Sequence, residues 1–194
     1  MIVLPGDEVN VRIPRQFSYT KDGKTYATVL GTIENGHFVP YEFVYTPKLG
    51  DVVVGRVIAE KKRVAYIVDL GAYKTAVIMT RGLPVRIKIG DVVMGKLEQS
   101  DEILSNVRVL RGGALIKIHP SKIARVIGTN GSMVKIIKEK TETSIYVGYN
   151  GYIYVAGKNV SKAIKAIYTI EKRAHIHGLT DFISKMLEGG KNES

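Results

Sequence analysis

Residues 118–136 read IHPSKIARVIGTNGSMVKI, and this stretch decides the fold of the second half of the chain. Ser121 is a good N-cap for a short helix, because the apolar residues at positions 123, 124, 126 and 127 then share one helical face. That helix ends at Gly128, and a second helix begins after Gly131. Two glycines three apart let the backbone approach a sugar-phosphate chain closely, while the second helix points its free N–H groups toward it. The pattern therefore predicts a helix–G-x-x-G–helix unit suited to a phosphate backbone.

The residues on either side complete an α+β unit. A short apolar strand is expected at 114–118, two strands at 143–149 and 152–156 around an Asn150-Gly151 hairpin turn, and a helix at 160–174. This order of elements resembles a type I KH domain, the eukaryotic topology of that family. In KH domains the G-x-x-G loop clamps the backbone of about four unpaired nucleotides. The alternative is a helix–turn–helix in another kind of α+β domain, whose two glycines are only helix C-caps.

The formal net charge of the 194-residue chain is +11, which indicates a polyanionic partner, either nucleic acid or an anionic surface. The charge is unevenly distributed. Residues 1–45 hold four basic and five acidic side chains, residues 46–110 hold eleven and seven, and residues 111–194 hold fourteen and six. Because the excess of positive charge grows toward the G-x-x-G unit, the distribution favours RNA binding over a basic surface kept for solubility.

The composition also excludes several classes of protein. The chain has no cysteine, so it has neither disulfides nor a thiolate zinc site. It has no apolar run near the roughly 20 residues of a membrane span, and its N-terminus lacks the basic region of a signal peptide. We therefore expect a soluble, cytoplasmic protein that has no membrane partner and uses no metal or other cofactor.

Residues 1–45 are predicted to form an N-terminal β module. Asp22-Gly23 and Asn35-Gly36 are hairpin turns, and apolar alternation fills 26–33 and 37–45. The module is nearly neutral and has several aromatic residues that look exposed, so it suits a protein partner better than RNA. The alternative is that it only packs on the next domain.

Residues 46–111 are predicted to form a small β-barrel. The sequence GDVVVGRV at 50–57 is echoed by GDVVMGKL at 90–97, and each copy is a Gly-Asp turn followed by a β-branched strand with a glycine where the strand bends. Further strands are expected at 64–70, 73–79 and 103–110. Five short strands without a helix indicate an OB fold, and the pattern resembles the S1 type of that fold.

Basic and aromatic side chains of this barrel are candidates for RNA binding. Cations would follow the phosphates, and an aromatic ring on the second strand, a role that the S1 resemblance gives to Tyr66, would stack on a base. The basic loop at 81–88 could face a pore or an RNA strand. The alternative is that Tyr66 faces inward and that 61–63 is a solvated loop. The candidates are Arg56, Lys61, Lys62, Arg63, Tyr66, Tyr73, Lys74, Arg81 and Arg86.

Residues 112–178, after a Gly112-Gly113 hinge, are assigned to the KH domain. Residues 179–194 are assigned to a short helix at 181–187 and a disordered tail. His175 and His177 are expected to cap the last KH helix rather than to bind a metal. The chain is thus predicted to be a multidomain β and α+β protein, with an N-terminal β module, an S1-type OB barrel and a C-terminal KH domain.

These three parts, in this order, resemble the S1–KH RNA-binding cap subunit of the archaeal exosome. The resemblance covers residues 3–174, and its sharpest marks are VLPGD at 3–7, GDVVVGRV at 50–57 and RVIGTNGSM at 125–133. It implies a non-catalytic subunit, present in three copies on a ring of phosphorolytic subunits, which binds single-stranded RNA and guides its 3′ end into the ring. Residues 1–45 would dock on the ring, and the barrels would line the pore.

Within the KH domain, the loop and the cations of its flanking helices are the candidates for RNA binding. Neither residue between the two glycines is basic, unlike in many KH loops that clamp nucleic acid. The same G-x-N-G form in exosome caps can pack against the S1 barrel, so the resemblance leaves open whether this loop contacts RNA or the barrel. The candidates are Lys122, Arg125, Gly128, Thr129, Asn130, Gly131, Ser132 and Lys135.

Two other functions remain as alternatives. A free-standing S1–KH protein of ribosome assembly or translation would bind RNA without a ring. An exonuclease would need paired acidic residues for two metal ions, whereas Asp69, Asp91 and Asp101-Glu102 sit at turns, where Asp is expected anyway. No catalytic motif occurs in its structural context, so the chain is expected not to be an enzyme.

Overall fold

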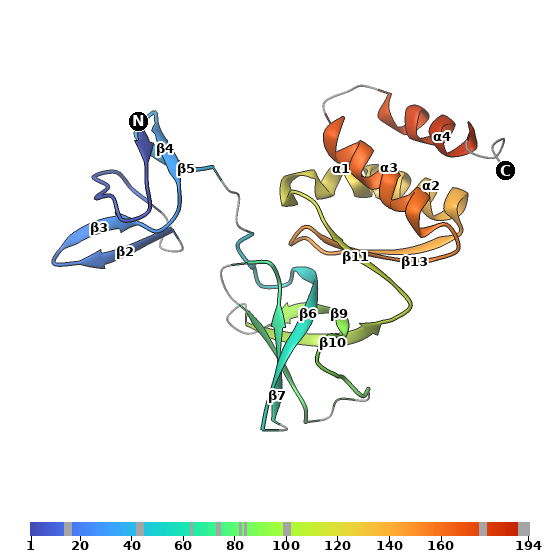
Figure 1. Ribbon diagram of the computed structural model, residues 1–194, viewed down its shortest axis with the longest axis horizontal. Coiled ribbons are helices and arrows are strands. Elements are labelled where there is room, and N and C mark those ends of the chain that lie inside the picture. The colour runs from blue at the N-terminus through green and yellow to red at the C-terminus, as the bar shows by residue number, and fades with distance from the viewer. Residues whose placement is uncertain are drawn as a thin grey trace. The chain divides into compact units, whose positions relative to one another are not determined.

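In the computed structural model the chain folds into two compact units, Met1–Val44 and Tyr45–Ser194 (Figure 1). A β-rich N-terminal part, a five-stranded barrel and an α+β domain follow one another along the chain, which confirms the predicted fold class. The residues that the structure describes are 1–13, 17–41, 45–62, 64–72, 75–81, 83, 85–98, 102–174 and 178–189.

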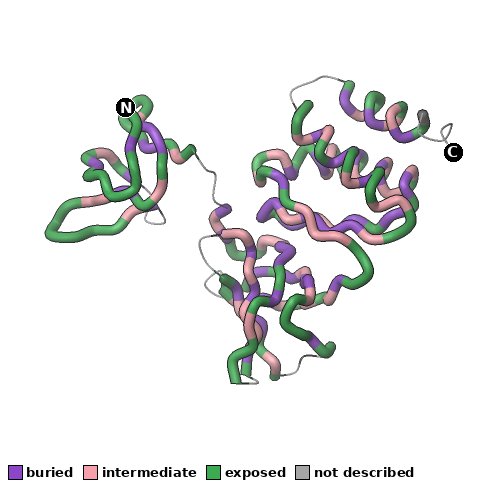
Figure 2. Tube along the Cα trace, viewed as in Figure 1, coloured by how far each residue is buried: buried purple, intermediate pink, exposed green. Residues whose placement is uncertain are grey.

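The N-terminal unit is built from two small antiparallel sheets. One sheet has the order β1-β4-β5, and the other pairs β2 with β3. Buried positions of this unit are purple in Figure 2. Its core consists of aliphatic and phenylalanine side chains: Val3, Val9, Ile13, Phe17, Ala27 and Phe38. The strands are β1 (Ile2–Val3), β2 (Ser18–Lys21), β3 (Lys24–Ala27), β4 (Gly31–Glu34) and β5 (His37–Pro40).

Both predicted hairpin turns of this unit are confirmed. Asp22-Gly23 and Asn35-Gly36 have positive φ at both residues, which is what a two-residue type I′ turn requires. The apolar alternation at 26–33 does not correspond to one strand, because the chain leaves one sheet after Ala27 and enters the other at Gly31. Apolar alternation alone does not reveal that a strand is shared between two sheets.

The first part of the second unit is a closed barrel with the strand order β10-β8-β7-β6-β9. β10 pairs with β8 in parallel and the other neighbouring strands are antiparallel, an arrangement typical of an OB fold. Gly55 permits close approach of β6 and β7, because a Cβ there would lie 2.5 Å from Val68 Cγ1. The strands are β6 (Val52–Lys61), β7 (Ala65–Asp69), β8 (Ala76–Met79), β9 (Val92–Glu98) and β10 (Ile103–Leu110).

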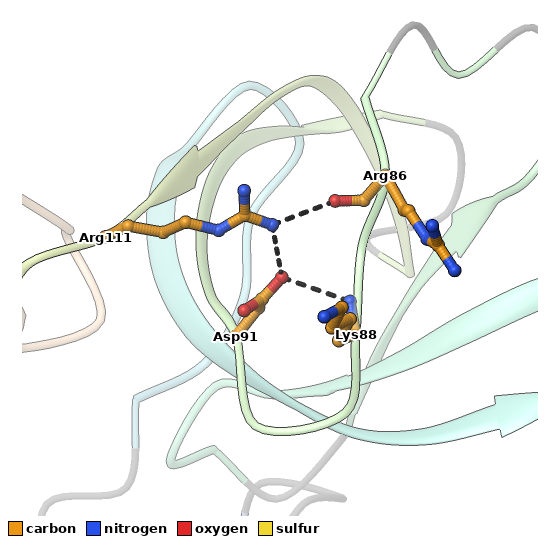
Figure 3. Close-up of polar contacts among 4 residues, drawn as sticks. All are labelled: Arg86, Lys88, Asp91 and Arg111. Carbon is orange, nitrogen blue, oxygen red and sulfur yellow. Dashed lines mark hydrogen bonds and ion pairs between the residues drawn. The ribbon is translucent and has the colours of Figure 1, made fainter.

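The second Gly-Asp turn of the barrel is held by a cluster of hydrogen bonds (Figure 3). The Asp91 carboxylate accepts from the Lys88 backbone N–H and from the Arg111 guanidinium, both at 3.0 Å. The same Arg111 nitrogen also donates to the Arg86 carbonyl at 3.0 Å. Because Arg111 begins the connection to the next domain, its side chain ties that connection to the barrel.

The rest of the second unit is an α+β domain in which helices cover one face of a three-stranded antiparallel sheet, order β11-β13-β12 (Figure 1). Side chains alternate along the strands, so Ile145 and Val155 join the core beneath the helices while Tyr146 and Tyr154 face the barrel. The final helix is longer than predicted and buries Ile183 in the same core. The elements are β11 (Gly113–Lys117), η2 (Pro120–Lys122), α1 (Ile123–Ile127), η3 (Thr129–Gly131), α2 (Ser132–Thr141), β12 (Thr143–Val147), β13 (Tyr152–Gly157), α3 (Val160–Lys172) and α4 (Leu179–Gly189).

The tip of the β12–β13 hairpin differs from its prediction. A two-residue Asn150-Gly151 turn of type I′ needs positive φ at both residues, but only Gly151 has it, at 88°. Instead the Gly148 N–H donates to the Tyr152 carbonyl at 2.9 Å, so the loop has one residue more than predicted. The predicted turn type is wrong because the Asn150 side chain forms hydrogen bonds with the barrel.

The carboxamide of Asn150 enters the barrel. Its Oδ1 accepts from the Val54 N–H at 3.2 Å, and its Nδ2 donates to the carbonyls of Val54 and Leu70 at 2.7 Å and 2.8 Å. The neighbouring Tyr149 N–H donates to the Val52 carbonyl at 2.9 Å. Asn150 is fully buried, and its side chain joins the tip of the KH hairpin to the barrel.

Apolar and aromatic contacts surround this polar insertion. The Tyr154 ring packs with Val54 and other buried aliphatic residues of the barrel, and the Tyr152 ring lies so close to Gly71 that a Cβ there would approach it to 3.0 Å. Burial raises the pKa of the Tyr152 phenol and nearby Asp69 raises it further, against the opposite influence of Arg56. The barrel and the KH sheet therefore share one packed junction.

We predict that Asn150→Asp destabilises the protein strongly. The substitution removes the Nδ2 donor and places a carboxylate beside the Val54 and Leu70 carbonyls, which costs about 3 kcal/mol or more. The melting temperature should fall by roughly 6–12 °C, at about 2–4 °C per kcal/mol for a chain of this size.

Asn35→Asp is the matched control, because Asn35 also belongs to an Asn-Gly turn but is exposed and in the left-handed region. Its melting temperature should stay within about 2 °C of the parent, as for a surface change. Equal melting temperatures for the two variants in calorimetry would contradict the role given to the Asn150 insertion.

Candidate nucleic-acid interface

The two glycines of the G-x-x-G loop meet different backbone requirements. Gly128 has φ 75° and ψ 172°, and a Cβ there would lie 2.7 Å from the Met133 backbone nitrogen. Gly131 has φ 78° and ψ 12°, and a Cβ there would meet nothing within 4 Å. Gly128 thus lets α2 approach α1, whereas Gly131 only turns the chain into α2.

Two adjoining hollows flank this loop, and Arg125, Gly128 and Thr129 line both of them. The smaller hollow, of about 190 Å³, is completed by the first residues of α2 and by the approach to α4: Ser132, Met133, Gly178, Leu179 and Thr180. The larger, of about 370 Å³, is completed by Ser121, Lys122, Ala124 and Ala174. The structure therefore brings five of the predicted KH residues together: Lys122, Arg125, Gly128, Thr129 and Ser132.

The charge and the backbone of these hollows suit an anion. Their described lining residues include two cations and no carboxylate. The Arg125 Nε donates to the Ala174 carbonyl at 2.9 Å, which orients the guanidinium at the rim that the two hollows share. No described side chain caps the start of α2, where the Ser132 N–H donates to the Thr129 carbonyl, and the helix dipole favours negative charge there.

Three other predicted KH residues lie outside the lining of both hollows. Asn130 is exposed at the tip of the loop, with φ 53° and ψ 29°, and Gly131 follows it. Lys135 is exposed on α2, and its ammonium lies 3.9 Å from Glu139 of the same helix. Lys135 is therefore set apart from the cations that line the hollows.

The loop lies in the helix layer, on the side of the KH sheet away from the barrel (Figure 1). The barrel contacts of this domain come instead from Asn150 at the hairpin tip and from Tyr154 on the opposite face of the sheet. The neighbours of the loop in the smaller hollow belong to α2 and α4. This arrangement favours RNA, rather than the barrel, as the partner of the G-x-N-G loop.

The described barrel candidates fall into two groups at opposite ends of the β6–β7 ladder. Lys61 pairs with Ala65 and Arg56 with Asp69, so the two cations stand about 16 Å apart at roughly 3.3 Å per residue. Exposed Lys62 follows Lys61 in the chain and lies at the same end of the ladder. Exposed Arg81 also lies at this end, because the N–H of the preceding Thr80 donates to the Val64 carbonyl at 2.9 Å.

Arg86 belongs to the other group, because its carbonyl accepts from Arg111 at the hinge (Figure 3). Tyr66 is half-buried and packs against the barrel core, which supports its inward-facing alternative. The structure therefore does not gather the barrel candidates that it describes into one patch. The predicted Arg63, Tyr73 and Lys74 lie outside the described residues, as do His175 and His177 and the tail at 190–194.

Within the described ranges, no group of three or more His, Asp or Glu side chains is placed to hold a metal ion. The helices that the structure describes also fall short of the length and apolar character needed to cross a membrane.

A third hollow, of about 460 Å³, holds residues that the sequence did not point to. It lies between β10 of the barrel and the β12–β13 side of the KH sheet, where Arg108 is placed over the Tyr146 ring at 5.3 Å from its centroid. Sequence patterns describe one element at a time, so they could not bring a barrel arginine and a KH tyrosine together.

Comparison with known proteins is consistent with this architecture. The KH domain family model matches residues 114–172. The exosome complex component Rrp4 of Pyrococcus horikoshii is 34% identical, over 88% of this chain and 75% of that protein, and Rrp4 of Thermoplasma acidophilum is 33% identical, over 99% and 92%. The crystal structure of a protein assigned as an exosome complex RNA-binding protein matches with a TM-score of 0.67 and 29% identity, over 76% of this chain and 97% of that one.

We predict that asparagine is tolerated at position 131 but not at position 128. Asn adopts the left-handed region at little cost, so Gly131→Asn should lower the free energy of unfolding by less than about 1 kcal/mol. Gly128→Asn combines a backbone conformation reserved for glycine with a clash against Met133, which costs at least about 2 kcal/mol. Urea unfolding of both variants measures the difference, and equal losses would contradict the separate roles of the two glycines.

Proposed function

Because the chain belongs to the Rrp4 family of exosome components, we propose that it is the RNA-binding cap subunit of an exosome. In this role it holds single-stranded RNA and guides the 3′ end of that RNA into a ring of phosphorolytic subunits. The observation that supports RNA binding is the positive charge beside the G-x-x-G loop. Lys122 and Arg125 line the hollows there, and the described lining residues include no carboxylate.

The proposed RNA contact is made by backbone and cations together. A phosphate placed at the start of α2 would lie at the positive end of the helix dipole, with Arg125 on one side and Lys122 at the start of α1. Such contacts position a strand without reading its bases. We therefore expect broad recognition of unpaired RNA by this loop, as an entrance for many transcripts requires.

The N-terminal unit is the proposed docking module for the ring, in an assembly with three copies of this chain. In its three-stranded sheet Ile2 and Val39 both pair with Thr32, so all three residues lie on one face. Ile2 and Val39 have 64% and 42% of their surfaces exposed. Exposed aliphatic residues that flank Thr32 on one face of a small sheet suit a protein partner, and the near-neutral charge of the unit does not favour RNA.

The subunit is proposed to be non-catalytic. The carboxylates that an exonuclease would need are engaged in turns: Asp69 accepts from the Gly71 N–H at 2.8 Å, and Asp91 accepts from Lys88 and Arg111. Tyr45 donates its hydroxyl to Asp51 in the first Gly-Asp turn. These carboxylates stabilise the barrel, and degradation is left to the ring.

We predict that Lys122→Ala with Arg125→Ala weakens binding of single-stranded RNA and lowers its salt dependence. Each lost phosphate contact should reduce the slope of log K against log salt by about 0.7, so the double variant should lose about 1.4. Fluorescence anisotropy over a series of salt concentrations measures this slope.

The matched control removes two charges from the exposed face of α3, as Lys165→Ala with Lys172→Ala, and should leave the slope nearly unchanged. An unchanged slope in the Lys122/Arg125 variant would show that RNA binds elsewhere. Shortening of the RNA when phosphate or magnesium is added to the pure protein would contradict the non-catalytic assignment.

We predict that Ile2→Lys with Val39→Lys prevents incorporation into the exosome without affecting RNA binding. Two ammonium groups on the docking face cannot be buried against a partner unless they are paired. Affinity purification of tagged protein from the native cell, followed by mass spectrometry, should recover ring subunits with the parent and none with the variant.

Ile58→Lys is the control, since Ile58 is an exposed aliphatic residue of the barrel, at 48%, and its variant should still recover the ring. Normal recovery by the Ile2/Val39 variant would mean that another surface docks. Recovery of ribosomal proteins instead of ring subunits by the parent would favour the free-standing alternative.

A further inference from the structure

The third hollow lies on the opposite face of the KH sheet from the G-x-x-G loop. Strand β10 and the hinge form one wall, and the barrel-facing side of β12 and β13 forms the other. Its polar lining comes from Arg108, Arg111, Ser144, Tyr146 and Tyr154. Its volume of about 460 Å³ is within the usual range of ligand sites.

A β-bulge places Arg108 in this hollow. Between the pairs Ser105↔Lys96 and Arg108↔Met94, β10 has one more residue than β9, and Asn106 takes a left-handed conformation with φ 50°. Leu104 points into the barrel core, so regular alternation would turn residue 108 inward as well. The extra residue reverses the alternation, so that Val107 packs toward the core and Arg108 faces outward.

The exposed Arg108 guanidinium lies over the Tyr146 ring, with 5.3 Å from its central carbon to the ring centroid. Among the described residues no carboxylate pairs with Arg108, so its N–H donors are not neutralised. Two acidic residues that contact lining residues of the hollow are already paired: Asp91 with Arg111 at 3.0 Å, and Glu142, which lies against Gly157, with Lys158 at 3.1 Å. The hollow is therefore a positively charged site with a flat platform.

We infer that this hollow, named here the junction groove, is a second RNA-binding site that holds one unpaired nucleotide. The base stacks on the Arg108–Tyr146 platform, as bases do on arginine and aromatic planes in single-strand-binding proteins. The remaining Arg108 donors meet the adjacent phosphate, and the exposed Ser144 hydroxyl lies within the same groove to bond the base or ribose.

The chemistry favours RNA over an acidic protein segment as the occupant. A glutamate-rich peptide needs cations but gains little from a flat stacked surface, whereas an unpaired base uses both. The inference rests on the proposed RNA-binding function and adds a contact outside the KH loop. Because the groove is formed jointly by barrel and KH sheet, RNA bound there touches both domains at once.

The test uses the full-length chain and a single-stranded RNA of about 12 nucleotides, within the range of site sizes of such proteins. Arg108→Ala and Tyr146→Leu should each weaken binding by roughly 5- to 150-fold, the range for loss of one stacked base. Tyr146→Phe keeps the ring and should weaken binding less than Tyr146→Leu does. Lys165→Ala, the control, removes a charge of the same sign from the exposed face of α3 and should bind as the parent does. Photocrosslinking of an RNA that contains 4-thiouridine should label the peptide with Tyr146.

The outcomes separate the groove from the proposed function. If the parent binds RNA and both Arg108→Ala and Tyr146→Leu bind equally well while folded by circular dichroism, the groove is not an RNA site, although the proposed function stands. If the parent binds no RNA, both proposals fail together. If a poly-glutamate peptide crosslinks at Tyr146 and RNA does not, the groove serves an acidic protein partner and the inference is overturned.

Discussion

The insertion of Asn150 into the barrel is the contact on which the architecture of the second unit depends. Its carboxamide supplies one acceptor and two donors to backbone groups of the barrel, and each of those groups would otherwise be buried without a partner. Hydrogen bonds are directional, so they define the orientation of the KH sheet more narrowly than the packing of Tyr154 could alone. That orientation leaves the G-x-x-G loop, where RNA is proposed to bind, on the side of the sheet away from the barrel, and it brings Tyr146 beneath Arg108.

Much of the fold follows from local patterns, because the rules behind them act over a few residues. The glycines at 128 and 131 separate two helices as predicted, and the repeated Gly-Asp turns precede β6 and β9. The failures occur where a distant part of the chain decides the local conformation. Asn150 leaves the two-residue turn to reach β6, and the extra residue in β10 inverts the facing of every later side chain in that strand.

The part of the candidate site that lies on one short helical segment could be predicted from the sequence. Lys122 and Arg125 stand one turn apart beside Gly128, so their proximity follows from helix geometry. The positions of the barrel candidates were less predictable. A strand pattern indicates which face of the sheet a residue lies on, but it does not indicate which residues of neighbouring strands lie close to it. Arg56 and Lys61 therefore separate, and half-buried Tyr66 packs on the core. The junction groove combines residues of two domains, and no single motif contains them.

The hairpin tip also protects the barrel from association with other chains. β6 pairs with β9 from Val52 to Arg56, but its pairing with β7 begins only at Arg56, so the first residues of β6 have one side without a strand. Tyr149 and Asn150 occupy that side by bonding Val52 and Val54. A sheet edge left open is a template for unwanted strand addition. Without its KH domain the barrel would therefore expose the unpaired backbone groups at the start of β6, so the barrel depends on the KH hairpin to complete this edge.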